Sequence, residues 1–486
     1  MAMNIVATLK DLRKVLLILA FLVVFFIVLS PPHDADMWWH LAAGREMVEQ
    51  GKILTTDIFS YTHYGEKWTN AFWLSDIVLF VAYKFGEYLG ITLLTALTAV
   101  LTMAVIYRHT LCSPFPLALL IIILAAFAIA PVWTPRPQIF SFLLLAILDY
   151  GLKENNGFIL KRPWLLVVLF ILWANIHGGF IWGFLLIISF IAGNGIDRVL
   201  KRENNLSIRQ LGHFGIWTLI AAFAIVINPN GISLWKLPFY TVGVSIQSIT
   251  EWGSPNFHRL DLHPILWLLF LIIIGTGTSK KSLSGSSILK VIGFAYMAFI
   301  SQRSIGPFVI VATPVVINSL NDVWSECLSL LSRIYKPKKP SPLPEIFVVI
   351  LNLFILGIFA VLAILRAYSV SRVEQVHNGL PLKVVQWIRE NPPDGRMFNA
   401  YNWGGYLQWE LPEYPVFIDG RADLYGEKTI NDWWSVVNAT DQGVALLDSW
   451  QANFVILEPG WPILEKLAQN GWHVLYEDDI AIVMGR

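Results

Sequence analysis

Cysteine and charge are scarce in this sequence. Only two cysteines occur in 486 residues, and 14% of the residues are charged. Two cysteines far apart in the chain, Cys112 and Cys327, indicate neither a disulfide framework nor a thiolate metal site. The net charge of +1 gives no electrostatic reason to expect nucleic acid or a strongly acidic partner. The sequence also has no Walker loop, GxSxG or HExxH motif, which disfavours ATP hydrolysis, serine hydrolysis and zinc proteolysis.

Hydrophobic residues make up 56% of the chain, and its mean hydropathy is +0.58. Soluble domains contain about 25% charged residues, so we expect most of this chain to lie in lipid. Several apolar runs are shorter than roughly 20 residues, the length that a bilayer normally requires, and these are expected to tilt or to extend into polar flanks. Together the runs predict an α-helical polytopic membrane protein with eleven spans, at residues 15–30, 88–107, 115–132, 138–152, 164–176, 180–196, 214–227, 264–275, 289–301, 305–320 and 345–366.

Basic residues before the first span set the predicted orientation. Lys10, Arg13 and Lys14 place the N-terminus in the cytoplasm, and an odd number of spans then places the C-terminus outside. The first run ends in Pro-Pro-His rather than in a small-residue cleavage site, which indicates a retained span rather than a secretory signal. This predicts a membrane module and a following external α/β domain: residues 1–368, with external loops at 31–72 and 228–263, and residues 369–486.

Shorter patterns predict the elements outside the membrane. In the first external loop, residues 37–51 and 68–85 are expected to form helices on the membrane surface. The tail is long enough for a small domain with its own core. Its periodicity predicts helices at 381–391 and 463–471, buried strands at 415–419 and 454–458, and a closing hairpin over 472–484.

Two carboxylates and two imidazoles follow the first span directly, in the stretch His33-Asp34-Ala-Asp36-Met-Trp-Trp-His40. Charge at bilayer depth costs about 2.5–3.5 kcal/mol per residue, so this cluster must be hydrated or paired. Asp34 and Asp36 could form a catalytic site, with one accepting a proton and the pair binding a divalent cation such as Mg²⁺ or Mn²⁺. The alternative is that one aspartate caps a helix that begins near Met37.

Cationic and polar residues lie at the external ends of later spans. Arg136, between two prolines and beside Gln138, and Arg303 are candidates for binding phosphate, because a guanidinium presents a planar fork of donors to an oxyanion. The alternative for Arg136 is contact with lipid headgroups. His177 precedes Gly-Gly, which permits close approach of a ligand, although a simple turn would also explain it. Glu251 lies in the second external loop, which is longer than a connection between spans requires.

Two stretches of the tail are rich in aromatic and polar residues. Asn399–Tyr406 contains Trp403, and Phe417–Tyr425 contains Asp419 and Arg421. Indole rings and amide or carboxylate groups suit sugars, whose ring faces are apolar and whose rims are hydroxyl groups. The alternative is a set of turns that cap a small sheet, with Asp419, Arg421 and Asp423 in an internal salt-bridge network.

The chain resembles the GT-C superfamily of integral membrane glycosyltransferases. The resemblance depends on Asp34-Ala-Asp36 with Trp38-Trp39-His40-Leu41 after the first span, on the many spans, and on the external C-terminal domain. The segments Asn402-Trp-Gly-Gly-Tyr406 and Asp419-Gly-Arg-Ala-Asp423 are similar to those of a bacterial branch of GT-C-like proteins. The resemblance implies a bacterial plasma-membrane protein that uses a polyprenyl-phosphate sugar donor on the external face and inverts the anomeric carbon.

The resemblance implies roles for the candidate residues. Asp34 or Asp36 would be the general base for an acceptor hydroxyl, while Arg136, Arg303 and His177 would stabilise the departing lipid phosphate. The acceptor would be a lipid, a polysaccharide or a protein. Two other functions stay open: a transporter of lipid-linked saccharide, and a non-catalytic assembly protein on the same scaffold. A transporter would need polar residues along the middle of several spans, whereas here polarity gathers at the external ends.

Overall fold

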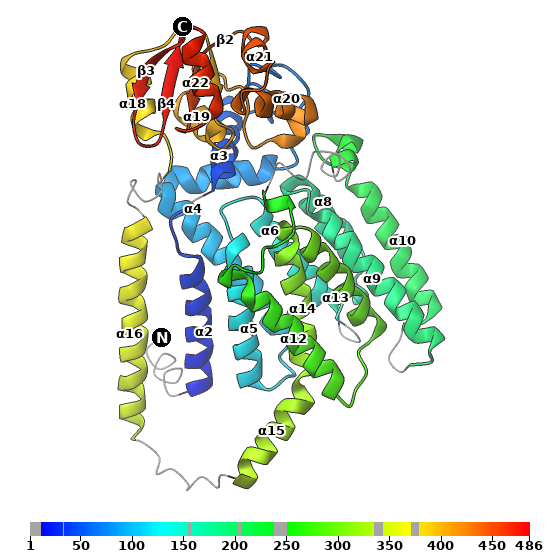
Figure 1. Ribbon diagram of the computed structural model, residues 1–486. Coiled ribbons are helices and arrows are strands. Elements are labelled where there is room, and N and C mark those ends of the chain that lie inside the picture. The colour runs from blue at the N-terminus through cyan, green and yellow to red at the C-terminus, as the bar shows by residue number, and fades with distance from the viewer. Residues whose placement is uncertain are drawn as a thin grey trace.

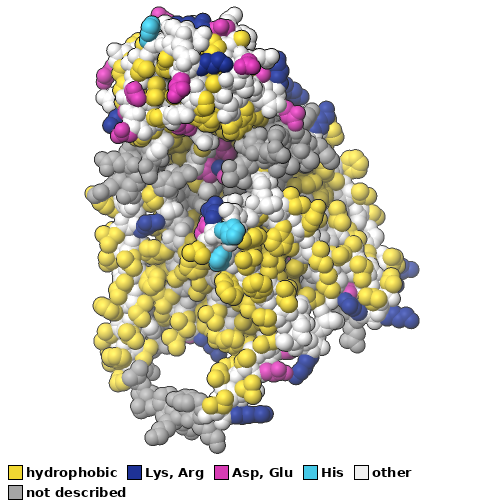
Figure 2. Space-filling view, viewed as in Figure 1, with side chains coloured by type: hydrophobic (Ala, Val, Ile, Leu, Met, Phe, Trp, Pro, Cys, Tyr) yellow, Lys and Arg dark blue, Asp and Glu magenta, His cyan; other side chains and the backbone are white. Residues whose placement is uncertain are grey.

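The computed structural model describes residues 11–32, 34–153, 157–202, 206–237, 250–334, 344–370 and 379–486. His33, Lys10, residues 238–249 of the second external loop and most of the basic linker after Arg333 therefore lie outside the described residues. Figure 1 shows a large helical part with a smaller mixed part at one end, formed by the C-terminal residues. The surface of the helical part is mainly hydrophobic, whereas charged side chains are spread over the C-terminal part (Figure 2). Apolar surface of this extent is expected where a protein contacts lipid rather than water.

Each of the eleven predicted spans coincides with a helix of the structure. These are α2 (Leu12–Val28), α4 (Trp73–His109), α5 (Phe115–Ile129), α6 (Gln138–Gly151), α8 (Leu165–Ile176), α9 (Phe180–Val199), α10 (Ile208–Ala224), α12 (His263–Thr278), α13 (Gly285–Ile300), α14 (Ile305–Ser319) and α16 (Glu345–Val370). Among the described residues, five helices are long and apolar enough to cross a membrane, or six if the bent pair Gln302–Ser319 and Asn321–Ile334 is one span. The chain is thus a multi-pass membrane protein, and the count of eleven spans stays a prediction.

Short elements connect these helices. They are η1 (Ala130–Val132), α7 (Phe158–Lys161), η2 (Gly231–Lys236), η4 (Thr250–Trp252), η5 (Leu260–Leu262), η6 (Gln302–Ser304) and α15 (Asn321–Ile334). A hydrogen bond connects η6 to the residue after η4. The backbone N–H of Gln302 donates to the carbonyl oxygen of Gly253 over 3.0 Å. This bond fixes the end of the second external loop beside the turn that precedes α14.

The first external loop contains α3 (Ala35–Gln50), as predicted. Asp34 caps this helix, because its Oδ1 accepts the backbone N–H of Asp36 over 2.9 Å, and Gly51 ends it in the left-handed conformation with φ 64°. α3 packs closely on the start of α4: a Cβ at Gly44 would lie 2.7 Å from Cβ of Phe80 and would clash with the backbone of Asp76. Glu87 breaks α4 at φ 48° and ψ −137°, so the part of α4 before it is separate from the span, again as predicted.

The C-terminal part is a small α/β unit. Its helices are α18 (Leu382–Glu390), α19 (Gly404–Glu410), α20 (Ala422–Val437), α21 (Gly443–Ser449) and α22 (Pro462–Gln469), with the turn η7 (Tyr401–Trp403) before α19. Its strands are β1 (Arg396–Asn399), β2 (Ala452–Leu457), β3 (His473–Glu477) and β4 (Ile482–Gly485). They form one sheet in the order β1-β2-β4-β3, with β1 parallel to β2 and the other neighbours antiparallel.

Most predicted elements of the tail are present, and one is wrong. The helices near 381–391 and 463–471, the strand near 454–458 and the closing hairpin are confirmed. The predicted strand at 415–419 is not part of the sheet. Val416 instead pairs with the first external loop, where its backbone bonds to Phe59 and Tyr61. The buried apolar run Val416–Ile418 thus joins the C-terminal part to the membrane part.

One hydrophobic core continues from α3 into the C-terminal part. Met37, Trp38 and Leu41 of α3 share it with Tyr406 and Leu407 of α19, and the ring centroids of Trp38 and Tyr406 lie 5.0 Å apart. The Gly-Gly pair of α19 makes this contact possible, since a Cβ at Gly405 would lie 3.0 Å from the backbone of α3. α3 therefore forms a platform on which the C-terminal part rests.

Candidate functional site

A cavity of about 700 Å³ lies between α3, the ends of the membrane helices and the C-terminal part. Separate segments of the chain form its walls: the N-terminus of α3, the turn before α6, the end of the second external loop, the turn before α14, and the residues after β1 and before α20. Eight of the residues predicted to form the site line this cavity: Asp34, Asp36, His40, Arg136, Gln138, His177, Glu251 and Arg303.

Arg136 lies at the centre of three carboxylates. Its Nε donates to Asp34 Oδ2 over 2.5 Å, and its Nη1 lies 3.1 Å from Asp36 Oδ2. Glu251 accepts from Nη1 over 2.8 Å and from Nη2 over 3.1 Å. Paired, bidentate contacts of this kind are the strongest that a guanidinium makes. All three nitrogens of Arg136 are thus engaged by protein carboxylates.

The turn before α6 holds Arg136 in this position. The two prolines that flank Arg136 restrict their own φ angles, and the backbone N–H of Arg136 donates to the carbonyl oxygen of Thr134 over 2.7 Å. Gln138 donates through Nε2 to the carbonyl oxygen of Val132 over 2.9 Å. Gln138, a predicted substrate-binding residue, lines the cavity, and its amide nitrogen also closes the turn that presents Arg136.

Arg303 lies across Glu251 from Arg136 and is less constrained. Its Nε is 3.7 Å from Glu251 Oε2, beyond hydrogen-bond distance, and its guanidinium lies 5.2 Å from the ring centroid of Trp252. Its side chain is 36% exposed, whereas that of Arg136 is 10% exposed. Arg303 is therefore the guanidinium whose donors are available to a ligand.

The surroundings of Asp36 perturb its acidity. Burial and the neighbouring charge of Asp34 raise the pKa of Asp36 to about 6, although the positive charge of Arg136 acts in the opposite direction. Burial opposes the charge of Arg136, but the three carboxylates outweigh it and hold the pKa of Arg136 well above its usual value. Arg136 is thus a fixed positive charge, while the pKa of Asp36 is raised toward neutral pH.

The surroundings of the two histidines of the cavity disfavour the protonated form of each ring. Burial and the charge of Arg303 lower the pKa of His177 to about 3. The backbone N–H of Gly179 donates to its Nδ1 over 2.8 Å, and a backbone N–H can only donate, so the ring proton of His177 is on Nε2. Burial and the charge of Arg136 likewise lower the pKa of His40 well below its usual value, and His40 Nδ1 lies 2.7 Å from Asp76 Oδ1.

The C-terminal part contributes a wall that the site prediction missed. Tyr401, Asn402 and Asp423 line the cavity together with the aromatic rings of Trp433, Trp434 and Trp461. Burial raises the pKa of Asp423 to about 6. The sequence contained a signal for Asn402 and Asp423 as site residues, because both lie in the polar-aromatic stretches of the tail. No feature of the sequence marked the three tryptophans as residues that line the same cavity as Asp36.

Gly420 allows this wall to approach Asp36. A Cβ at Gly420 would collide with Asp36 Oδ1 and would lie 3.0 Å from Trp39 Nε1. Only glycine therefore fits at this position beside α3 without displacing the carboxylate.

Trp403, Asp419 and Arg421, which the sequence offered as candidates for sugar contact, do not line the cavity. Arg421 pairs with Asp419 and Asp57, each over 2.6 Å, and both acids are completely buried. Trp403 is buried and donates through Nε1 to the carbonyl oxygen of Gly379 over 3.1 Å. The alternative of an internal salt-bridge network accounts for Asp419 and Arg421, and Asp57 takes the place in it that was expected for Asp423.

The acidic residues do not fit a divalent cation as they are arranged. Among the residues that the structure describes, no group of three or more acidic, histidine or cysteine side chains is placed to hold a metal ion. The oxygens of Asp34, Asp36 and Glu251 converge on the guanidinium of Arg136 instead. A cation bound by these carboxylates would have to displace Arg136.

Solved structures of membrane glycosyltransferases have the same fold. No protein-family profile and no curated protein matches the sequence. The chain is similar to the oligosaccharyltransferase AglB from Archaeoglobus fulgidus, solved with an inhibitory peptide and a dolichol-phosphate, with a TM-score of 0.57 at 14% identity over 92% of this chain and 69% of that one. It is also similar to ArnT from Cupriavidus metallidurans in the apo state, with a TM-score of 0.53 at 15% identity over 95% of this chain and 96% of that one.

These likenesses define the fold of the chain. A further ArnT structure, bound to undecaprenyl phosphate, matches with a TM-score of 0.50 at 14% identity over 96% of this chain and 97% of that one. The chain has a GT-C-like fold, shared with AglB and ArnT, and a small C-terminal α/β part, as the sequence predicted.

Proposed function

We propose that this protein is a membrane glycosyltransferase that moves a sugar from a polyprenyl-phosphate donor to an acceptor on the extracytoplasmic face of a bacterial plasma membrane. The observation that supports this most is the convergence of charge in one cavity. Asp36, Glu251 and Arg303 come from three distant segments and line the same 700 Å³ space. A polyprenyl chain could lie along the apolar helices while its phosphate and sugar enter the cavity. Both AglB and ArnT have been solved with polyprenyl phosphates.

Asp36 suits the role of general base better than Asp34. Asp34 is committed on both oxygens, since Oδ1 caps α3 and Oδ2 binds Arg136. The Asp36 side chain is 21% exposed, and its ion pair with Arg136 uses Oδ2. A base with a pKa near 6 is mostly ionised at neutral pH and can still accept a proton. We assign proton transfer to Asp36, and the positioning of Arg136 and α3 to Asp34.

We assign stabilisation of the leaving phosphate to Arg303 and His177. As the acceptor oxygen bonds to the anomeric carbon, the bond from that carbon to the phosphate oxygen breaks and the phosphate keeps the electron pair. The acceptor proton passes to Asp36. The donors of Arg303 and the Nε2–H of His177 then stabilise the new negative charge more in the transition state than in the ground state. Attack opposite the leaving phosphate inverts the anomeric carbon.

Arg136 supplies the positive charge that a divalent cation would bring. It neutralises the repulsion among Asp34, Asp36 and Glu251 and keeps Asp36 oriented toward the cavity. In this proposal the transfer requires neither Mg²⁺ nor Mn²⁺. The earlier assignment of Arg136 to phosphate binding is replaced by this role, since its nitrogens are already engaged.

The aromatic wall is proposed to contact the sugar or the acceptor. Trp434 and Trp461 are partly exposed at the cavity, and their ring centroids lie 6.3 Å apart at an angle of 71°. Indole faces in this arrangement suit the apolar face of a sugar ring. A lipid, a polysaccharide or a protein acceptor is compatible with this wall, and nucleic acid is not expected as a partner.

The test is release of undecaprenyl phosphate from undecaprenyl-phosphate sugars, by transfer or by hydrolysis, with the purified protein in lipid vesicles. Asp36→Asn should lower the rate at least 100-fold, the lower range for loss of a general base. Asp441→Asn, a matched change at an exposed position of the C-terminal part, should leave it unchanged. Equal rates for Asp36→Asn and wild type would refute the assignment. Donor binding without release by wild type would favour the transporter or assembly functions.

A further inference from the structure

A second cavity lies at the other end of α6. It has a volume of about 280 Å³ and is lined by residues of α4, α6, α9, α13 and α14 and by the turn after α6. Gln138 begins α6 near the candidate active site, whereas Asp149 lies eleven residues further along, which is about 16 Å at 1.5 Å per residue. The volume suits a small charged group rather than a large organic ligand, since ligand pockets usually measure about 300–1,000 Å³.

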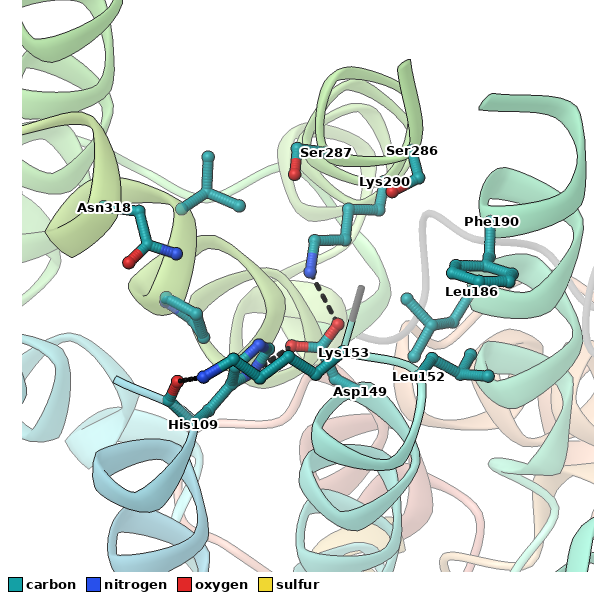
Figure 3. Close-up of a pocket in the computed structure, with 12 residues that line it drawn as sticks. His109, Asp149, Leu152, Lys153, Leu186, Phe190, Ser286, Ser287, Lys290 and Asn318 are labelled. Atoms are coloured by element: carbon teal, nitrogen blue, oxygen red, sulfur yellow. Dashed lines mark hydrogen bonds and ion pairs between the residues drawn. The ribbon is translucent and has the colours of Figure 1, made fainter. Parts of the chain in front are cut away.

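Two lysines and a histidine converge on this cavity (Figure 3). Lys290 Nζ lies 2.6 Å from Asp149 Oδ1, and His109 Nδ1 lies 3.3 Å from Asp149 Oδ2. Lys153 donates through Nζ to the carbonyl oxygen of His109 over 2.6 Å. Both members of the Lys290–Asp149 pair are at least nine-tenths buried. Ionisable residues buried among membrane helices are costly and indicate a functional site.

The charges in the cavity leave one ammonium without an acidic partner. Asp149 is the only acid among the described residues that line the cavity, and it is matched by Lys290. Lys153 donates to an uncharged carbonyl oxygen, and no carboxylate in the described part of the chain forms an ion pair with it. The cavity therefore favours an anion.

The remaining lining residues are both polar and apolar. Ser286 and Ser287 lie near Lys290, while Leu186 and Phe190 lie to one side of it (Figure 3). The first turn of α13 does not supply the attraction for an anion. Ser284 caps this turn, and Asp197 accepts the backbone N–H of Gly285 over 2.7 Å. The positive charge comes from the two lysines, and the serine hydroxyls add neutral hydrogen-bond donors.

We propose that this cavity binds a phosphate group, held by Lys153 and Lys290 with the hydroxyls of Ser286 or Ser287. The phosphate could belong to the headgroup of an anionic phospholipid, whose glycerol would contact Leu186 and Phe190, or to a soluble phosphate compound. The site is separate from the candidate active site and does not depend on sugar transfer.

Lys153→Gln is the informative substitution. It removes the unpaired ammonium and leaves the Lys290–Asp149 pair intact, whereas Lys290→Gln would strip Asp149 of its main partner and is expected to destabilise the fold. Loss of one charge-assisted contact should weaken binding about tenfold. Lys281→Gln is the matched control, because Lys281 is an exposed lysine in the loop before α13 and lies outside the cavity.

Two arms distinguish the source of the phosphate. In the first, the full chain is placed in nanodiscs of phosphatidylcholine with phosphatidylglycerol, and native mass spectrometry measures the phosphatidylglycerol that it retains. In the second, inorganic phosphate is titrated against the melting temperature of the protein in detergent at constant ionic strength. A Lys153-dependent effect in the first arm alone assigns a lipid headgroup, and one in the second arm assigns phosphate itself. No effect in either arm, or equal effects in Lys153→Gln and wild type, would overturn the proposal and leave a structural ion pair.

Discussion

Replacement of Arg136 by methionine tests whether one guanidinium holds three carboxylates together. The substitution keeps a long side chain but leaves Asp34 without its cation. The Asp34 side chain is 2% exposed, and removal of one partner of a buried ion pair costs about 3–5 kcal/mol. Asp36 and Glu251 are 21% and 44% exposed, so water can replace much of their contact with Arg136. We therefore expect a loss of about 3 kcal/mol, mostly through Asp34.

A double substitution separates this ion pair from general damage to the fold. Asp34→Asn removes the charge but keeps an oxygen that can cap α3, because asparagine is as good a cap as aspartate. In the Arg136→Met background it should recover about 1–2 kcal/mol, the usual size of coupling between contacting residues. The assay is thermal unfolding in detergent, followed by tryptophan fluorescence, at a fixed heating rate. Additive losses in the double variant, or an unchanged melting temperature for Arg136→Met, would refute the reasoning.

Three further predictions concern the cavity. The pKa of Asp36 is raised to about 6, and protonated Asp36 cannot accept a proton. We therefore expect kcat/KM to fall roughly tenfold per pH unit below pH 6. A flat profile from pH 7 to 5 would exclude Asp36 as the base. Because Arg136 occupies the space among the carboxylates, EDTA should leave transfer unchanged, and restoration of a lost activity by Mg²⁺ or Mn²⁺ would show that a metal is needed. Gly420→Ala should displace Asp36 and lower turnover. The control Gly212→Ala, at an open position on α10, should be neutral or slightly stabilising. Equal turnover in the two variants would contradict the close approach of Gly420 to Asp36.

The sequence predicted local features well because their signals are local. Eleven apolar runs became helices, and α3 begins at its aspartate cap and ends at Gly51. Capping, apolar length and alternation depend on neighbours in the chain, so they can be read without a fold. The segment 415–419 failed for the opposite reason. Its apolar run is typical of a buried strand, but its backbone partners come from the first external loop.

The site was harder to predict, because it depends on contacts between distant segments. Asp34 could be assigned to a cap or to a site, and in the structure it both caps α3 and accepts from Arg136 at the cavity. Arg136 and Arg303 looked equivalent in the sequence, yet Glu251 separates an engaged guanidinium from an available one. Asp419 and Asp423 are four residues apart, but only Asp423 lines the cavity. The short separation of Asp419 and Asp423 in the sequence did not indicate which of the two acids lines the cavity.

Localisation of a bound polyprenyl phosphate tests the central claim most directly. An electron cryomicroscopy map of the full chain with undecaprenyl phosphate should show phosphate density within hydrogen-bond distance of Arg303, on the side of the cavity that contains His177 and Asp36. The lipid tail should leave the cavity between membrane helices. Phosphate density elsewhere at saturating lipid, with the cavity empty, would contradict the account.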